Sequence, residues 1–164
     1  MRAVANAGPL IHFSWIDQLD LLPALFEEVL VPLAVQHEVL RASPDVPGVP
    51  ALRVAFASDW LTTQAVADRS AVARLTADLD LGESEAIVLM REVEADFLLL
   101  DDRRGREFAE RQGLPMMGTI GILRTARNRG LIPSVTPLLE ELQRRQFRVS
   151  AQLVDQIRRE EADR

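Results

Sequence analysis

The chain has 164 residues, 48% hydrophobic and 27% charged, a composition that fits one globular domain rather than a disordered segment. It has no cysteine and only two histidines, which excludes disulfides, thiolate zinc sites and thiol nucleophiles and leaves oxygen as the main ligand for any metal. The net charge of −6 argues against broad non-specific nucleic-acid binding, and no apolar run approaches the ~20 residues that span a bilayer, so we expect a cytoplasmic protein.

Short apolar segments alternate with helical patterns through the first half of the chain. Strand-length apolar runs are separated by stretches in which apolar residues recur at helical spacing. One segment rich in proline interrupts the pattern as a loop. The elements expected in chain order are a strand at 2–5, a turn at 6–9 leading into a helix, a helix at 21–28, a strand at 29–31, a helix at 33–41, a loop at 43–50, a short helix at 51–57, an edge strand at 60–66 and a helix at 68–79.

The second half continues the alternation and ends in helices. The continuous apolar run at 97–100 is typical of a buried parallel strand. Glycines and hydroxyl residues stand where helices would end and begin. The elements expected are a helix at 83–93, a strand at 97–100, a helix at 103–112 ended by Gly113, a strand at 115–117, a helix at 120–129 capped by Thr119 and ended by Gly130, and helices at 138–146 and 151–161, the last capped by Ser150, with a frayed end at 158–164.

This alternation of strands and helices predicts an α/β fold with a mostly parallel central sheet. The chain shows no repeat, no low-complexity tract and no second domain, so residues 1–164 are interpreted as a single domain. Residues 134–164 form a C-terminal helical extension, interpreted as a hairpin. Such a hairpin either covers the domain or pairs two subunits, and we expect a homodimer.

Polar residues at strand ends are the first candidates for a functional site, because ligands of open α/β sheets gather beyond the carboxyl ends of the strands. Asn6 follows the first strand, and Glu38 lies in the helix after the second. By themselves, Asn6 fits a turn residue and Glu38 an ordinary helix carboxylate. Glu83 opens a helix on the same face as its apolar residues, where a carboxylate needs a partner, whereas Glu85 points elsewhere.

Two adjacent aspartates end the strand at 97–100. Asp101 is the first polar residue at the ligand-binding edge, which favours a functional role. Asp102 fits the N-cap of the next helix better than a metal ligand, although the sequence leaves open which of the two binds metal. Arg103 follows directly and fits either a solvated helix face or a phosphate clamp, an alternative that is weaker for Arg104 and Arg106. The histidines, His12 and His37, read as ordinary core or surface residues.

Several short motifs occur along the chain in a fixed order. Each is brief, but their joint occurrence in this order is fairly specific. They are Val4–Ile11, Val31–Glu38, Leu81–Ile87, Leu100–Arg106, Gly118–Leu123 and Gly130–Pro133. In these motifs the chain resembles the PIN-domain ribonucleases, the superfamily that includes the toxins of many prokaryotic toxin–antitoxin pairs. More closely, it resembles a small PIN-like branch without an assigned function.

The resemblance implies a three-layer α/β/α sandwich and an acidic pocket that binds Mg²⁺ or Mn²⁺ and cleaves RNA. It implies that Asn6, Glu38, Glu83 and Asp101 are the catalytic positions. These four and Asp102 would ligate the metal, while Arg103 and Thr119 would position the phosphate. The partners it implies are an RNA substrate and a small antitoxin protein, with no membrane.

One position departs from the pattern, because asparagine stands at position 6 where active PIN enzymes carry aspartate. An amide oxygen still ligates a hard cation but brings no negative charge, so metal affinity and water activation should fall. Two hypotheses follow: a metal-dependent ribonuclease that is the toxin of a toxin–antitoxin pair, or a catalytically weakened PIN-like module that binds RNA or protein. A phospho-acceptor receiver domain is disfavoured, because such a domain needs a lysine and this chain has none.

Overall fold

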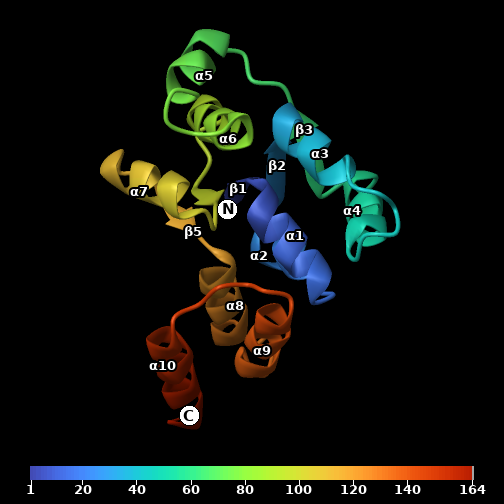
Figure 1. Cartoon of the computed structure of the whole chain (residues 1–164), viewed down its shortest axis with the longest axis vertical. Coiled ribbons are helices and arrows are strands. Elements are labelled where there is room, and N and C mark those ends of the chain that lie inside the picture. The colour runs from blue at the N-terminus through green and yellow to red at the C-terminus, as the bar shows by residue number, and fades with distance from the viewer. Residues whose placement is uncertain (164) are drawn as a thin grey trace. The chain divides into compact units, whose positions relative to one another are not determined.

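The computed structural model describes residues 1–163, and Arg164 lies outside the described residues (Figure 1). The chain separates into two compact units, Met1–Thr119 and Ile120–Arg164, called here the N-terminal and C-terminal units. This boundary falls earlier in the chain than the start of the predicted extension at 134–164.

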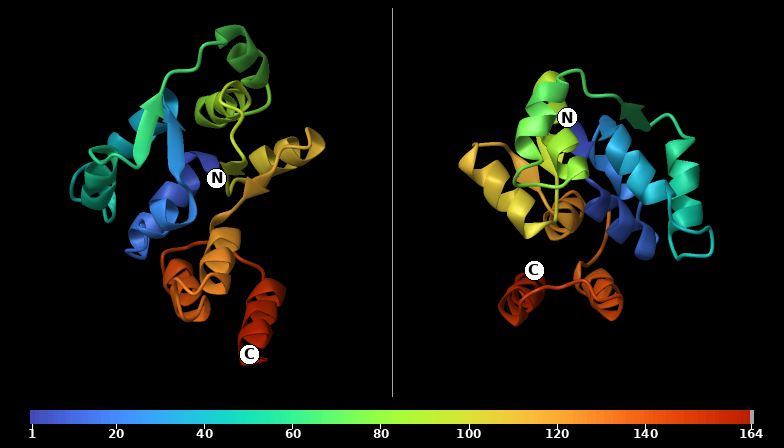
Figure 2. Two further views of the ribbon diagram at one scale, coloured as in Figure 1. Left: turned by 180° about the vertical axis from the view of Figure 1, so that it is seen from behind. Right: turned by 45° about the horizontal axis from the view of Figure 1, so that its top comes forward.

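The N-terminal unit is built on one sheet in which every neighbouring pair of strands is parallel. The strand order is β3-β2-β1-β4-β5, and Figure 2 shows β2 and β3 side by side. The central strands are short runs of fully buried apolar residues, which confirms the predicted parallel α/β fold. The strands are β1 (Arg2–Ala5), β2 (Glu28–Pro32), β3 (Leu61–Gln64), β4 (Phe97–Leu99) and β5 (Met116–Met117).

Helices cover both faces of this sheet, which makes a three-layer α/β/α arrangement. The central helix of the unit, α6, packs against β1, β2 and β4. Residues 82–90 of this helix are all buried, and their apolar side chains form a core with those of the strands. The helices of this unit are α1 (Ala7–Trp15), α2 (Leu21–Leu25), α3 (Leu33–Leu40), α4 (Val49–Phe56), α5 (Arg69–Leu75), α6 (Leu81–Glu92) and α7 (Arg103–Arg111).

The C-terminal unit is helical. Its elements are α8 (Thr119–Asn128), whose first residue belongs to the N-terminal unit, α9 (Thr136–Arg144) and α10 (Ala151–Ala162). Ser150 caps α10 as predicted, by accepting a hydrogen bond from the amide of Leu153 at 3.2 Å. The prediction that residues 158–164 fray was wrong for 158–162, because α10 continues to Ala162.

Loop and cap residues explain where several helices end. Gly113 and Gly130 follow α7 and α8 with φ angles of 65° and 73°, the left-handed region that glycine adopts without strain, so both predicted helix ends are confirmed. The predicted cap at Thr119 was wrong, because α8 begins at Thr119 itself and its hydroxyl donates to Asp101. Within residues 1–163 no helix is both long and apolar enough to cross a membrane.

Candidate functional site

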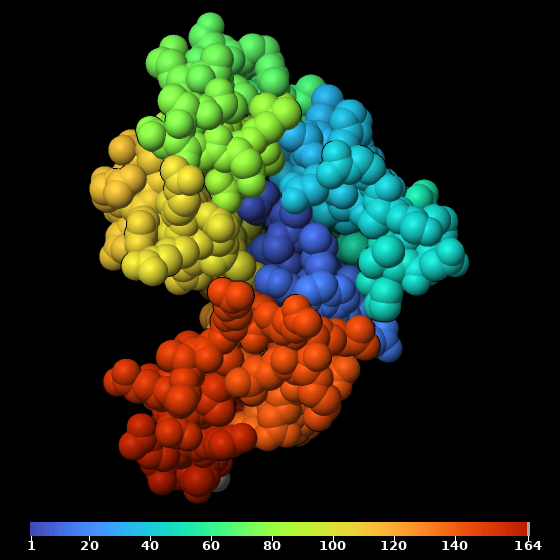
Figure 3. Space-filling model, in the orientation of Figure 1, coloured from blue at the N-terminus to red at the C-terminus, as the bar shows by residue number. Residues whose placement is uncertain are grey.

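The carboxyl ends of β1, β2 and β4 meet at one edge of the parallel sheet. Asn6 follows β1, α3 follows β2, and Asp101 and Asp102 follow β4. In the space-filling view the blue atoms of α1, which begins directly after Asn6, lie between the yellow-green atoms of α6 and α7 and the lighter blue atoms of α3 (Figure 3). The topology therefore brings the four predicted positions, Asn6, Glu38, Glu83 and Asp101, to the same edge.

Asn6 is the residue at this edge with an unmet hydrogen-bonding need. It is 8% exposed, and its backbone amide donates to the carbonyl of Leu99 at 2.9 Å, which ties the end of β1 to β4. Within residues 1–163 its Oδ1 is the one buried side-chain polar atom that has no hydrogen-bond partner. A buried acceptor without a partner costs roughly 1–3 kcal/mol, so this atom calls for a ligand or a water.

Gly82, at the start of α6, lies against both Asn6 and Glu38. A Cβ atom at Gly82 would lie 3.3 Å from Oε2 of Glu38 and 3.4 Å from Oδ1 of Asn6. It would also lie 3.3 Å from a methyl group of Val35. The absence of a side chain at Gly82 thus leaves a space next to two oxygen atoms that come from different elements.

A capping box starts α6 and brings two carboxylates to the same place. Oδ1 of Asp80 accepts a hydrogen bond from the amide of Glu83 at 2.8 Å, and Oε2 of Glu83 accepts one from the amide of Asp80 at 3.2 Å. The side chain of Asp102 lies within hydrogen-bonding reach of the Glu83 carboxyl. Asp102 also caps α7, as predicted, by accepting from the amide of Gly105 at 3.0 Å.

Two carboxyl groups at this edge, Glu83 and Glu38, have raised pKa values. Burial raises the pKa of Glu83 to about 7, and the hydrogen bond with Asp102 and the negative charges of Asp80 and Asp102 add to this effect, against the backbone hydrogen bond from Asp80. Burial and the charge of Asp80 also raise the pKa of Glu38, while Arg41 opposes them. The cluster formed by Glu38, Asp80, Glu83 and Asp102, called here the acid cluster, therefore holds more negative charge than its surroundings balance.

In contrast to Glu38 and Glu83, Asp101 has a lowered pKa, and both of its carboxylate oxygens are hydrogen-bonded. Its Oδ1 accepts from the Thr119 amide at 2.8 Å, and its Oδ2 accepts from the Thr119 hydroxyl at 2.5 Å and lies 2.8 Å from Nδ1 of His12. Burial alone would raise the pKa of Asp101, but the hydrogen bonds from His12 and Thr119 outweigh it and hold the pKa below its usual value. The ionised form of Asp101 is thus stabilised by the protein itself.

Basic side chains flank the acid cluster on the α3 side. His37, Glu38 and Arg41 line one side of a pocket of about 400 Å³, and Asp80 and Gly82 line the other. His37 and Arg41 are exposed and stand four residues apart, which places them on one face of the chain leaving α3. The pocket therefore combines carboxylates with two groups that attract phosphate.

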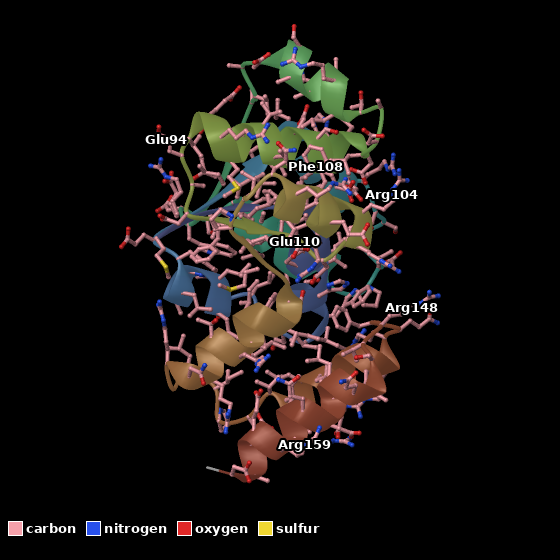
Figure 4. The ribbon with its side chains drawn as sticks, turned by 90° about the vertical axis from the view of Figure 1, so that its left-hand side faces the viewer. Glu94, Arg104, Phe108, Glu110, Arg148 and Arg159 are labelled. Carbon is pink, nitrogen blue, oxygen red and sulfur yellow. The ribbon has the colours of Figure 1, made fainter. Side chains whose placement is uncertain are left out.

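The arginines that follow Asp102 point away from the protein or pair locally. Arg103 is 90% exposed and contacts Glu107 at 3.0 Å. Arg104 projects from α7 into solvent (Figure 4). Arg106 is half-buried and donates to the carbonyl of Leu100 at 3.3 Å. Arg103 and Arg104 thus remain accessible to a large ligand, while Arg106 supports the end of β4.

The sequence anticipated some of these roles and missed others. It ranked Glu83 above Glu85 because Glu85 was expected to point away from the buried face, but Glu85 is buried as well and accepts hydrogen bonds from the amide of Ala34 and from Arg69. It missed the pairing of His12 with Asp101, which depends on contacts across the sheet edge. It also missed Asp80, although Asp80 and Glu83 carry the spacing of a capping box, a signal that was present in the sequence.

The oxygen atoms around Asn6 fit a hard divalent cation. The donors are one amide oxygen without a partner and carboxylates of raised pKa, and Gly82 leaves space between them. Within residues 1–163 no three histidine or acidic side chains stand in a geometry that would hold a metal together. Glu83 instead bonds Asp102 and a backbone amide, so binding a cation requires these side chains to turn toward Asn6.

Comparison with known proteins adds one finding. A family model described as a PIN domain matches residues 2–163, nearly the whole chain. No curated protein matches the sequence. The all-parallel sheet with helices on both faces agrees with this match. On this evidence the chain belongs to the PIN-domain family, whose fold is of the nuclease type.

Proposed function

We propose that this protein is a metal-dependent endoribonuclease that uses Mg²⁺ or Mn²⁺. The observation that carries the proposal is the unpartnered Oδ1 of Asn6, which lies with the Glu38 carboxylate beside Gly82 at the carboxyl edge of a parallel sheet. PIN domains generally depend on divalent metals, and this oxygen-rich pocket suits such an ion. The charge that the acid cluster does not balance internally is the charge that a cation would neutralise.

The five residues expected to ligate the metal divide into two roles in this proposal. Asn6, Glu38, Glu83 and Asp102 hold the cation, because their oxygens surround the space beside Gly82 or bond one another in its absence. Asp101 positions the end of β4 beside the site, because both its oxygens are already bonded to Thr119 and His12. When bound, the cation supplies charge against the developing phosphoryl charge and makes a nearby water more acidic.

The protein's own residues handle protons and the substrate phosphate. Near neutral pH the Glu83 carboxyl, with a pKa of about 7, retains a proton part of the time. Arg41, His37 and Arg103 are exposed next to the acid cluster and attract the phosphates that flank the scissile bond. Thr119 is fully buried, so it acts on the substrate only through the position of Asp101.

The biological role proposed here is that of a toxin in a toxin–antitoxin pair, with a small antitoxin protein as its partner and a homodimer as its assembly. Membership of the PIN-domain family supports this role. Induced expression of the wild-type chain should stop cell growth, and sedimentation of the purified protein should show two copies. Normal growth during high expression of active enzyme would argue against a toxin.

The direct test of the nuclease proposal compares two glutamates of α6. Glu83→Gln removes a charge from the acid cluster but keeps a residue that can complete the capping box. Glu92→Gln is the matched control, because Glu92 lies at the other end of α6, where it accepts hydrogen bonds from the amides of Ala67 and Asp68. Single-turnover cleavage of a labelled RNA with Mn²⁺ should fall by at least about a hundredfold in Glu83→Gln and persist in Glu92→Gln.

The same assay shows what would contradict the proposal. Equal cleavage by wild type and Glu83→Gln would mean that the activity comes from elsewhere or from a contaminant. No cleavage by the wild type with any divalent metal would favour the second function below.

The second candidate function is a PIN-like module that binds RNA or protein without cutting. The neutral side chain of Asn6 favours it, because a neutral ligand binds a cation less tightly than a carboxylate does. Calorimetric titration with Mn²⁺ separates the two functions. Tight binding by the wild type would count against the non-cutting module, and a gain of affinity in Asn6→Asp would place position 6 at the metal.

A further inference from the structure

Asp80 is the acidic residue of this pocket that the motifs did not single out. It is exposed, lines the same pocket as Glu38 and Gly82, and precedes the first turn of α6. It is hydrogen-bonded to the amide of Glu83 at 2.8 Å and shares its pocket with Glu38, so it lies close to residues of two different helices. Its Oδ1 is bonded to the amide of Glu83, whereas its Oδ2 accepts no hydrogen bond from the described residues.

Capping explains the oxygen of Asp80 but not its charge. Ser, Thr and Asn cap helices about as well as Asp, and Ser150 does so in this chain. The helix dipole of α6 favours a negative charge at this position, but the charge also lies beside the carboxylates of Glu38 and Glu83, and a cation in the pocket would offset that repulsion.

A second observation points to what offsets the charge. Asn6 is 8% exposed, and its unpartnered Oδ1 lies on the same side of Gly82 as the Glu38 carboxylate. This amide oxygen needs a positive or hydrogen-bearing ligand but supplies no negative charge of its own. A cation that reached Asn6 would also stand beside the pocket lined by Asp80.

We propose that Asp80 is a metal-binding residue of this site, and that its free Oδ2 supplies the negative charge that the neutral side chain of Asn6 lacks. Asp80 then has two roles, with Oδ1 starting α6 and Oδ2 facing the cation. The inference rests on the proposed function, since it assumes that the pocket binds Mg²⁺ or Mn²⁺. It adds a ligand from the helix cap itself, outside the four predicted positions.

The experiment removes the charge and keeps the cap. Asp80→Asn leaves a side-chain oxygen for the Glu83 amide, so the variant should fold as the wild type does. Asp68→Asn is the matched control, because Asp68 caps α5 in the same way, accepting from the amide of Ala71 at 2.9 Å, and takes no part in the pocket. Mn²⁺ titration by calorimetry should show a roughly ten- to hundredfold weaker affinity in Asp80→Asn. Asp68→Asn should bind as the wild type does.

A charge exchange sharpens the test. The double variant Asn6→Asp with Asp80→Asn moves one negative charge from the cap to the end of β1. If the two residues face the same cation, the double variant should recover most of the affinity lost in Asp80→Asn alone, a coupling that independent sites would not show. Asp80→Ser, which also keeps a capping oxygen, repeats the single change with a different side chain.

The outcomes separate this inference from the proposed function. Tight Mn²⁺ binding by wild type with a loss confined to Asp80 variants supports both. Equal binding by wild type and Asp80→Asn, or an equal loss in Asp68→Asn, overturns the role of Asp80 and leaves the nuclease proposal in place. No Mn²⁺ binding by the wild type overturns both.

Discussion

Two groups of carboxylates at the same edge of the sheet differ in how the protein treats them. Asp101 is held by His12 and Thr119, and its pKa is lowered despite burial. Glu38 and Glu83 stand among other acids, and their pKa values are raised. Asp101 is therefore a carboxylate whose charged form is stabilised by surrounding hydrogen bonds. Glu38 and Glu83 are carboxylates whose charged form is disfavoured by burial and by neighbouring acids.

The difference separates a carboxylate that is held by hydrogen bonds from the carboxylates that we propose bind a ligand. Hydrogen bonds to Asp101 join the end of β4 to α1 and to the first residue of α8, so that group contributes to stability. In the acid cluster, burial and neighbouring carboxylates raise the pKa values of Glu38 and Glu83, a common property of functional sites. The direction of the pKa shift distinguishes Asp101 from the acid cluster, whereas the number of carboxylate oxygens does not.

The largest effect is expected from Asp101→Ala. The change removes the acceptor of the buried Thr119 amide and hydroxyl and one partner of the half-buried His12, which should cost roughly 2–4 kcal/mol of unfolding free energy. Urea unfolding in the presence of a chelator measures it. The control is Asp102→Ala, which loses one cap hydrogen bond but relieves repulsion with Glu83 and should cost at most about 1 kcal/mol. Similar costs for the two variants would remove the contrast between Asp101 and the acid cluster.

The second prediction concerns how stability depends on pH through Glu161 in the C-terminal unit. Like Asp101, Glu161 has a pKa that hydrogen bonds lower despite burial. Burial would raise its pKa, but hydrogen bonds from Thr136, Val135 and Ser134 lower it to about 2. A lowered pKa means that this stabilisation is present above the ordinary value of 4.5 and is lost as the pH falls from there toward 2. Acid unfolding should therefore be less steep in Glu161→Gln between pH 4.5 and 2.

The control for Glu161 is its neighbour Glu160. That residue pairs with Arg124 at 2.5 Å and is 37% exposed, so Glu160→Gln should leave the acid profile nearly unchanged. An identical acid profile for wild type and Glu161→Gln would show that these hydrogen bonds do not stabilise the charged form.

A smaller effect of opposite sign is expected from Glu83→Gln without metal. The raised pKa of Glu83 means that the folded wild type binds this proton more tightly than the unfolded chain, so its stability falls as the pH rises from about 4.5 to about 7. Glutamine removes that dependence and should leave the variant equal to or more stable than wild type, by up to about 1 kcal/mol at pH 8. Thermal unfolding across this pH range in chelator decides it, and a clear loss of stability at pH 8 would show that the acid cluster is not strained.

The smallest change in stability is expected from Gly82→Ala. Alanine favours a helix by about 1 kcal/mol over glycine, but its Cβ would crowd Val35 and the oxygens of Glu38 and Asn6. The two effects nearly cancel in unfolding, whereas Mn²⁺ affinity should drop because the space beside Asn6 is filled. Calorimetry alongside urea unfolding measures both, and an unchanged affinity would place the cation away from Gly82.

Most of the fold followed from local patterns. The apolar runs at β1, β2 and β4 and the glycines after α7 and α8 predicted the elements closely, because burial on both faces and left-handed helix ends leave clear local signals. The Thr119 cap and the frayed end were wrong because hydrogen bonds to distant or tertiary partners replaced the local ones.

The sequence by itself determined the fold class and placed Asn6 after the first strand, Glu38 in the helix after the second strand and Glu83 in the first turn of a helix. Only the tertiary structure decided that Asp101 bonds His12 and Thr119, while Asp102 faces Glu83 and Asp80 faces the pocket. The reason is that neighbouring residues at a strand end point in different directions. Which carboxylate meets a donor and which meets another acid depends on elements far away in the chain.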